Sequence, residues 1–310
     1  MTTTLTSARS AKEQRPPRMR RRRPGASPLT LLMLAIPSIV LIALISIYPF
    51  VYAAGQSVRD GSLISPGSFV GLENYRTILS SPDFWHAALF TVVFTVVGVF
   101  GSWAIGMGLA LLLRTRVPAS GVFKVLLMLP WIVPIVVSST AWNWLVATPD
   151  SPIPLLFKLL GWGQPLFLAD PILAAITVCL FKVWVSFPFM MLMTSSALAS
   201  VDGSVYEAAN MDGASRWQQF RDITLPLIAR STYISWILMT IFCVNDFPTI
   251  YLLTGGGPVQ ATTSLVVLAY RAVFQDFQVG QGVAIAFLMT LVLVIVSVVL
   301  YRQIRKSEIE

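Results

Sequence analysis

Few residues of this 310-residue chain are of a kind that could do chemistry. His86 is the single histidine, and the two cysteines, Cys179 and Cys243, each lie within a strongly apolar stretch. One histidine and two separated thiols supply neither an acid–base cluster nor a metal-ligand spacing. We therefore expect His86 to lie at a helix end, both cysteines to be free and buried, and the chain to have no catalytic residue and no metal site.

A triple glycine at Gly255, Gly256 and Gly257, followed by Pro258, invites comparison with a phosphate-binding loop. Such a loop ends in Gly-Lys-Ser or Gly-Lys-Thr, whereas the residues after Pro258 here are Val and Gln. The chain therefore has no ATP-hydrolysing motif of this kind and is not expected to be an enzyme. We interpret the glycines as a tight external turn that lets the backbone pack closely against a neighbour.

Two charged residues lie deep inside apolar stretches. Lys182 is 11 residues in from Pro171, and Asp246 is seven residues before Leu253, which corresponds to about 16 Å and about 10 Å along a helix. Inside a membrane such a charge costs roughly 2.5–3.5 kcal/mol and faces protein or a water-filled cavity. Two interpretations stay open: the two charges pair beside a translocation path, or each contacts cargo hydroxyls separately.

Amides and aromatic rings nearby extend this candidate path. Trp184 and Asn245 lie in the same apolar stretches as the two charges, and Asn143 lies in another one. Their amides and ring offer the hydrogen-bonding and planar surfaces that suit a sugar. A tryptophan in such a position also suits simple packing or an interfacial belt, so that alternative stays open for Trp184.

The elements that must hold these residues are long apolar helices. The chain is 55% hydrophobic and 12% charged, with a mean hydropathy of +0.74, whereas charged residues supply roughly a quarter of a soluble domain. A bilayer core about 30 Å thick needs about 20 apolar residues per helix. The sequence thus predicts an all-α, multi-pass membrane protein, in which prolines 130, 134 and 188 kink or interrupt helices. We predict six spans, at Leu29–Ala54, Phe84–Leu113, Val122–Ala147, Pro171–Ala199, Thr232–Leu253 and Val283–Tyr301.

The placement of basic residues predicts the orientation of these spans. Of the 22 Lys and Arg residues, 17 fall on one side and four on the other, and Lys182 lies within a span, so both termini are expected in the cytoplasm. Residues 1–28 hold eight of them and read as a disordered basic tail next to the membrane, followed by a membrane domain over 29–310. Nucleic-acid binding by the tail is the weaker alternative, and we expect none.

One polar segment, EAANMDGASRWQQFRDITLP (207–226), lies between two of the most apolar runs and belongs to a cytoplasmic loop over 200–230. Ser204 with Glu207, and Ser215 with Gln218, have the capping-box spacing. Gly213 between them suits a helix stop, so we predict a helix, a glycine elbow and a second helix. The proline at 226 ends the segment or begins the next span.

This predicted helix pair suits one of two surfaces. A helix lying on lipid headgroups carries Lys and Arg on its polar face and bulky apolar residues opposite. Here the polar face carries Glu207 and Asp212, and the small residues Ala208 and Ala209 leave one side nearly bare. We favour docking to another protein over a lipid anchor.

The same twenty residues resemble the EAA---G---------I-LP signature of permease subunits in binding-protein-dependent ABC importers. The family often has a second proline near position 230, where this chain has an arginine. The resemblance implies the type I ABC importer permease architecture, with this loop as the coupling helix pair that contacts a cytosolic ATPase dimer. The residues implied in coupling are Glu207, Ala208, Ala209, Asp212, Gly213, Ile223, Leu225 and Pro226.

The resemblance also implies partners for the chain. They are a second homologous permease subunit, the ATPase dimer, an extracytoplasmic binding protein and the lipid bilayer of the cell membrane. ATP and magnesium are then bound by the ATPase, so that this chain binds no cofactor itself.

A second stretch, DFPTIYLLTGGGPVQATTSLVVLAYRAVF (246–274), is similar to the last external loop of the first permease subunit in carbohydrate importers of the maltose and glycerol-phosphate type. VGLENY at 70–75 fits the same type. The resemblance implies a sugar importer in which this chain forms half of the translocation path. Glycerol-3-phosphate or another polar solute is the alternative cargo. An ion-driven secondary carrier is an alternative of another class, but it leaves the helix pair unexplained.

Overall fold

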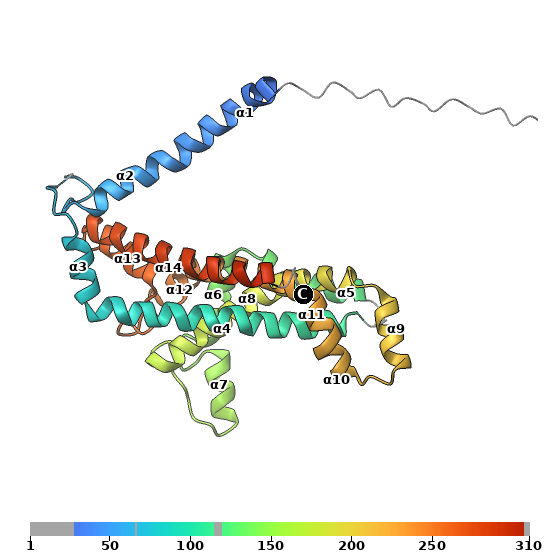
Figure 1. The fold of residues 1–310 in the computed structure, drawn as a ribbon. Helices are drawn as coiled ribbons and strands as arrows, with labels where there is room; N and C mark the ends of the chain where they lie inside the picture. The colour runs from blue at the N-terminus through green and yellow to red at the C-terminus, as the bar shows by residue number, and fades with distance from the viewer. Residues whose placement is uncertain (1–27, 66, 115–119, 307–310) are drawn as a thin grey trace, which may run out of the picture. The chain divides into compact units, whose positions relative to one another are not determined.

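The computed structural model describes residues 28–65, 67–114 and 120–306. The predicted basic tail lies outside this part of the chain, apart from Pro28. The described chain is nearly all helical (Figure 1), and it divides between Tyr52 and Ala53 into two units, each described by itself below.

The first unit is a single apolar helical run. It contains α1 (Pro28–Ile42), the π-helical turn η1 (Ala43–Ile47) and the start of α2 (Tyr48–Ser57), which continues into the second unit. Leu32–Ser57 is long and apolar enough to cross a membrane, and none of its most apolar residues is buried by other described residues. Apolar side chains exposed in this way are stable in lipid or against another chain. The prediction of a first span over Leu29–Ala54 is confirmed to within about three residues at each end.

Four long helices form the body of the second unit: α4 (Pro82–Leu112), α8 (Pro171–Ala199), α11 (Leu225–Val244) and α14 (Val279–Lys306). α4 and α8 approach closely because a Cβ on Gly106 would lie 2.6 Å from the backbone nitrogen of Met191, and small residues at a membrane helix interface allow such contact. Among the largest fully buried side chains of these helices are Phe94, Phe181, Met190, Ile228 and Met239. The predicted fourth span, Pro171–Ala199, coincides with α8.

The third predicted span is not one straight helix. The described residues contain five helices long and apolar enough to cross a membrane, and six when α5 (Ser120–Ile132) and α6 (Ile135–Val146) count as one span bent by 90°. Pro134 lies at the bend with φ −53° and ψ 134°. Its ring disfavours helical geometry at the preceding residue and removes a backbone donor. Pro130 and Pro188 lie inside α5 and α8.

The fifth predicted span, Thr232–Leu253, is also interrupted. α11 ends at Val244, and α12 (Phe247–Thr254) begins only after Asn245 and Asp246. Pro248 accounts for the break, because in a continued helix its ring would clash with the carbonyl of Val244. The prediction of one helix here is therefore wrong, and two polar residues occupy the junction.

Short helices lie between the long ones: α3 (Glu73–Ser80), α7 (Pro152–Leu159), α9 (Gly203–Met211), α10 (Arg216–Gln218) and α13 (Leu265–Phe274). α3 and α9 lie at opposite ends of the four-helix body (Figure 1). α3 is fixed by the asparagine of the VGLENY motif, since Asn74 Nδ2 donates to the carbonyls of Ser57 at 2.9 Å and Arg59 at 2.8 Å.

Candidate functional site

The predicted helix, glycine elbow and second helix are present. α9 ends in a Schellman motif: the Gly213 N–H donates to the Asn210 carbonyl at 3.1 Å, and the Ala214 N–H donates to the Ala209 carbonyl at 2.9 Å. Gly213 has φ +75°, a conformation that favours glycine. α10 then begins with the predicted capping box, in which Ser215 and Gln218 exchange side-chain and backbone hydrogen bonds.

The start of α9 differs from the prediction. The N-cap is Asp202, whose carboxylate accepts from the Ser204 N–H at 3.0 Å, so the proposed capping box of Ser204 with Glu207 is wrong. An aspartate two residues upstream of that serine makes the helix begin earlier, at Gly203. The hydrogen bonds from Ser204 hold the pKa of the Asp202 carboxyl below its ordinary value, because they stabilise the charged form.

Three contacts brace α9 against its neighbours. Tyr206 Oη lies 3.1 Å from Thr224 Oγ1, and Gln219 Nε2 donates to Asn210 Oδ1 at 2.7 Å. The guanidinium carbon of Arg114, just after α4, lies 4.3 Å from the centre of the Tyr206 ring, a cation–π distance. The helix pair is therefore fastened both to α4 and to the segment that follows it.

That following segment is continuous with a membrane span. α10 leads into the π-helical stretch η2 (Gln219–Thr224), and η2 leads directly into α11. Pro226 occupies the first turn of α11, where the π-helical geometry before it accommodates a residue without an N–H. Arg216–Val244 is thus one continuous helical segment of 29 residues, which joins the helix pair to the far end of α11.

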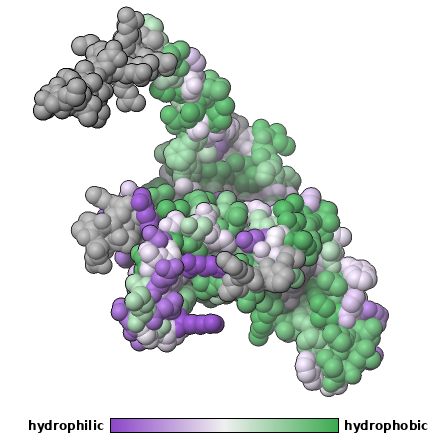
Figure 2. Space-filling model, turned by 90° about the vertical axis from the view of Figure 1, so that its right-hand side faces the viewer, coloured by the Kyte–Doolittle hydropathy of each residue, from purple (hydrophilic) through white to green (hydrophobic). Residues whose placement is uncertain are grey.

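The residues predicted for coupling divide into an outer and an inner set. Glu207, Ala208 and Asp212 are exposed, together with Met211, which is 90% exposed. The inner set, formed by Ala209, Ile223 and Leu225, is buried or half-buried, Pro226 is exposed at the start of α11, and Gly213 shapes the elbow. The expectation that Ala209 forms a bare outer surface is therefore wrong, because that side chain packs inward. Hydrophilic residues gather at this end of the molecule (Figure 2).

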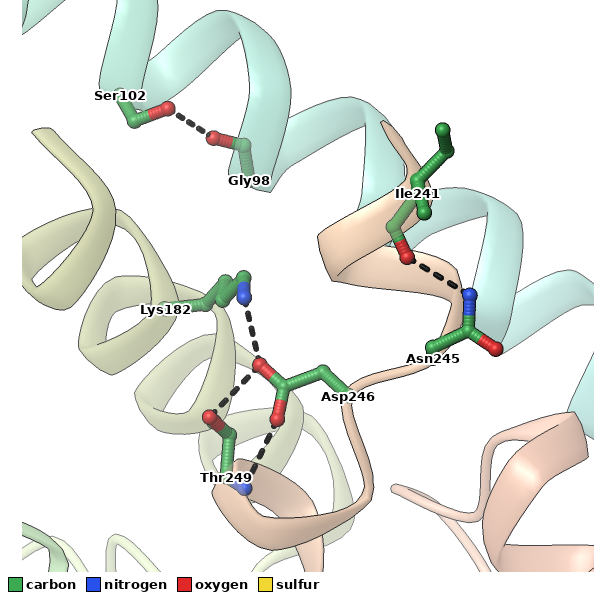
Figure 3. Close-up of polar contacts among 7 residues, drawn as sticks. All are labelled: Gly98, Ser102, Lys182, Ile241, Asn245, Asp246 and Thr249. Carbon is green, nitrogen blue, oxygen red and sulfur yellow. Dashed lines mark hydrogen bonds and ion pairs between the residues drawn. The ribbon is translucent and has the colours of Figure 1, made fainter. Parts of the chain in front are cut away.

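The two intramembrane charges form an ion pair. Lys182 Nζ lies 2.6 Å from Asp246 Oδ2, and their side chains are only 7% and 8% exposed. Asp246 also caps α12: its Oδ1 accepts from the Thr249 N–H at 3.0 Å and its Oδ2 from Thr249 Oγ1 at 2.8 Å. The three donors converge on one carboxylate in Figure 3. The predicted pairing is confirmed, with Asp246 at a helix junction rather than within a span.

The other residues of the candidate path are dispersed. Asn245 is exposed, and its Nδ2 donates to the Ile241 carbonyl at 2.9 Å. Asn143 Nδ2 reaches the Leu253 carbonyl at 3.5 Å and lines an open cavity of about 730 Å³ beside α7. Trp184 packs on the rings of Trp142 and Phe181. Of these three residues, only Asn245 is next to a residue of the ion pair in the sequence. Trp184 packs against other rings, which was the alternative interpretation of this residue.

The triple glycine forms the expected tight turn. Gly255 and Gly256 have φ +59° and +91°, and a Cβ on Gly256 would lie 2.7 Å from Thr263 Oγ1. The turn carbonyls accept hydrogen bonds, from Arg271 Nη2 to Gly255 at 2.6 Å and from Thr263 Oγ1 to Gly256 at 2.9 Å. The backbone therefore packs closely on the start of α13, as the prediction of a close approach required.

Sequence reasoning missed several residues that hold these sites together. Arg114, Tyr206 and Gln219 brace the helix pair, and Thr249 completes the buried carboxylate's hydrogen bonds. Asp246, two residues before Pro248, could have indicated the start of α12, because an aspartate followed by a proline in the first turn is typical of a helix N-terminus. Among the described residues no three His, Cys, Asp or Glu side chains lie close enough to hold a metal ion.

Residues 102–308 match the family model described as "Binding-protein-dependent transport system inner membrane component". The trehalose/maltose transport system permease protein MalF of Thermococcus litoralis is 32% identical over 274 residues, which cover 88% of this chain and 92% of the relative. The sulfoquinovosyl glycerol transport system permease protein SmoG of Agrobacterium fabrum is 32% identical over 90% of this chain and 91% of its own length.

Solved structures share the fold. A chain of a bacterial ABC transporter involved in the import of the acidic polysaccharide alginate superposes with a TM-score of 0.78 at 18% identity. The superposition covers 89% of this chain and 95% of that chain. A chain of a bacterial alginate ABC transporter in complex with an alginate pentasaccharide-bound periplasmic protein also superposes with a TM-score of 0.78 at 18% identity. At this identity the likeness concerns the fold alone.

Proposed function

This multi-pass membrane protein belongs to the family of binding-protein-dependent transport system inner membrane components, and we propose that it is a permease subunit of an ATP-driven carbohydrate importer. The names of the 32%-identical relatives, a trehalose/maltose and a sulfoquinovosyl glycerol permease, support a sugar or glycoside as cargo. In this role the chain forms half of a translocation path, and a second homologous permease forms the other half.

The observation that carries the proposal is the braced helix pair continuous with a span. α9, fastened through Tyr206 and Asn210 to η2, acts as a rigid lever where a flexible loop would absorb a force. Its exposed residues Glu207, Ala208, Met211 and Asp212 contact the ATPase on the cytoplasmic side. Closure of the ATPase dimer on ATP and magnesium then moves α11. The inward-facing Ala209, Ile223 and Leu225 keep the lever attached to the bundle.

The external side receives cargo from a binding protein. The triple-glycine turn is closed by Arg271 and Thr263, and Val259, just beyond it, is 92% exposed. A rigid turn that presents an exposed side chain suits a docking protein. Cargo then passes Asn245 beside the junction of α11 and α12, with Lys182 and Asp246 behind it and Asn143 and Trp184 farther away.

The test is ATP hydrolysis by the purified complex in nanodiscs, stimulated by its binding protein loaded with a panel of mono- and disaccharides and polyol phosphates. We expect stimulation by a carbohydrate. Stimulation only by glycerol-3-phosphate would select the alternative cargo. Uptake that follows an ion gradient without ATP would contradict the proposal and support a secondary carrier.

A further inference from the structure

The junction between α11 and α12 is held by groups from two different helices. Pro248 forces a break, but a proline alone does not fix where the next helix lies. Asp246 caps α12 through the Thr249 N–H and hydroxyl, and the same carboxylate accepts from Lys182 of α8. Its oxygens thus tie the start of α12 to the middle of α8.

Neither charge is placed to reach cargo. Both side chains are less than a tenth exposed, and both carboxylate oxygens of Asp246 already accept hydrogen bonds from protein groups. The Lys182 stem packs beside α4, where a Cβ on Gly98 would lie 3.2 Å from Lys182 Cγ. A buried ion pair whose carboxylate oxygens all accept hydrogen bonds from the protein has a structural or positioning role and does not contact cargo directly.

Asn245, the residue before Asp246, points away from the ion pair. Asn245 is exposed, and its amide turns back to the Ile241 carbonyl at the end of α11, whereas Asp246 turns toward α8 (Figure 3). Because Asn245 directly precedes Asp246, the anchoring of Asp246 to α8 and α12 restrains the backbone that carries the Asn245 amide.

We propose that Lys182 and Asp246 are positioning residues whose ion pair sets the Asn245 amide at the cargo path. This inference rests on the proposed function, in which Asn245 contacts the carbohydrate. The pair acts through Asn245 and does not itself touch cargo.

The first experiment is a double-mutant cycle in the complete transporter. Lys182→Met and Asn245→Ala are made singly and together, and the cargo concentration for half-maximal uptake is measured. Residues that act as a unit give non-additive changes. We expect each single variant to raise that concentration about fivefold and the double variant to raise it little further. Asp246→Asn, which keeps the cap of α12, should behave like Lys182→Met.

A merely structural pair gives a different result. The amount of folded transporter and its maximal rate would fall, while the half-maximal concentration stayed unchanged, or the two shifts would multiply independently. Either outcome overturns the inference and leaves the proposed function intact. Gly108→Ala in α4, where an added Cβ meets nothing within 4 Å, is the matched control.

A second measurement does not depend on cargo. Asn245→Cys is labelled with an impermeant thiol reagent, against the low background expected from the buried Cys179 and Cys243. We expect Lys182→Met to change the labelling rate about fivefold and Gly108→Ala to leave it unchanged. An unchanged rate with Lys182→Met overturns the inference whatever the complex transports. If the complex takes up no carbohydrate, the proposed function fails separately.

Discussion

Gly98 sets how closely α4 approaches the buried ion pair. A Cβ at this position would lie 2.8 Å from Cys243 Sγ and 3.2 Å from Lys182 Cγ. The absence of a side chain therefore gives the lysine stem room to lie between α4 and α8. Its ammonium group also lies 6.0 Å from the centre of the Phe94 ring on α4, within the range of a cation–π contact.

We predict that Gly98→Ala lowers the stability of the purified chain by about 1–3 kcal/mol, because the added methyl overpacks a filled interface. The loss is measured as a lower Tm in detergent. Gly108→Ala in the same helix should leave the Tm unchanged or raise it, since alanine is the better helix former. Equal Tm values for the two variants would contradict the close packing at Gly98.

At the residue scale, the sequence offered the ion pair as one of two interpretations and did not predict its surroundings. The depth of Lys182 and Asp246 in apolar stretches was enough to predict that they need partners. Thr249 was missed because its role depends on the start of α12, and we had predicted one continuous span there. Gly98 was missed because its contacts come from two other helices.

At the scale of elements, the elbow between α9 and α10 determines the direction of the lever. Gly213 has φ +75°, and its N–H donates to the Asn210 carbonyl. Tyr206 and Gln219 then hold the two arms together. The geometry of the pair therefore depends on one backbone conformation and a few hydrogen bonds.

We predict that Gly213→Pro uncouples ATP hydrolysis from uptake while membrane insertion stays intact. Proline fixes φ near −65° and removes the N–H, so the Schellman motif cannot form. ATPase activity and uptake are compared in proteoliposomes. Gly213→Asn should keep most coupling because asparagine tolerates positive φ. Gly203→Ala, where an added Cβ meets nothing within 4 Å, is the control, and normal uptake by the proline variant would contradict the lever.

The prediction of helices succeeded where the length of an apolar run determined the helix, and it failed where Pro248 divided a predicted span. α8 matched its predicted bounds because its long apolar run determines one helix, which continues through Lys182 and Pro188 without a break. The prediction that Pro134 kinks or interrupts a helix is confirmed by the bend between α5 and α6. The break before Pro248 was not located, since a proline within an apolar run either kinks or ends a helix and packing decides which. The N-cap of α9 shifted from Ser204 to Asp202 because two capping residues lie close together.

At the scale of the second unit, the two proposed docking regions lie apart. α9 lies at one end of the helical body, and α13, which follows the triple-glycine turn, lies toward the end that holds α3 (Figure 1). α11 connects the lever to the junction at Asn245. In the proposed function, this arrangement would let a single rod transmit ATPase movement to the level of the cargo path. The sequence predicted this plan through the spacing of its spans and its polar loop, but not the contacts that make the rod continuous.

The central claim is that α9 docks to an ATPase, and site-specific photo-crosslinking tests it most directly. A photoreactive side chain is placed at Met211, which is 90% exposed, and separately at Val259, which is 92% exposed. We predict that the probe at 211 crosslinks to the ATPase subunit and that the probe at 259 crosslinks to the binding protein and never to the ATPase. Adducts of the 211 probe with lipid alone, or with no ATPase, would contradict the account.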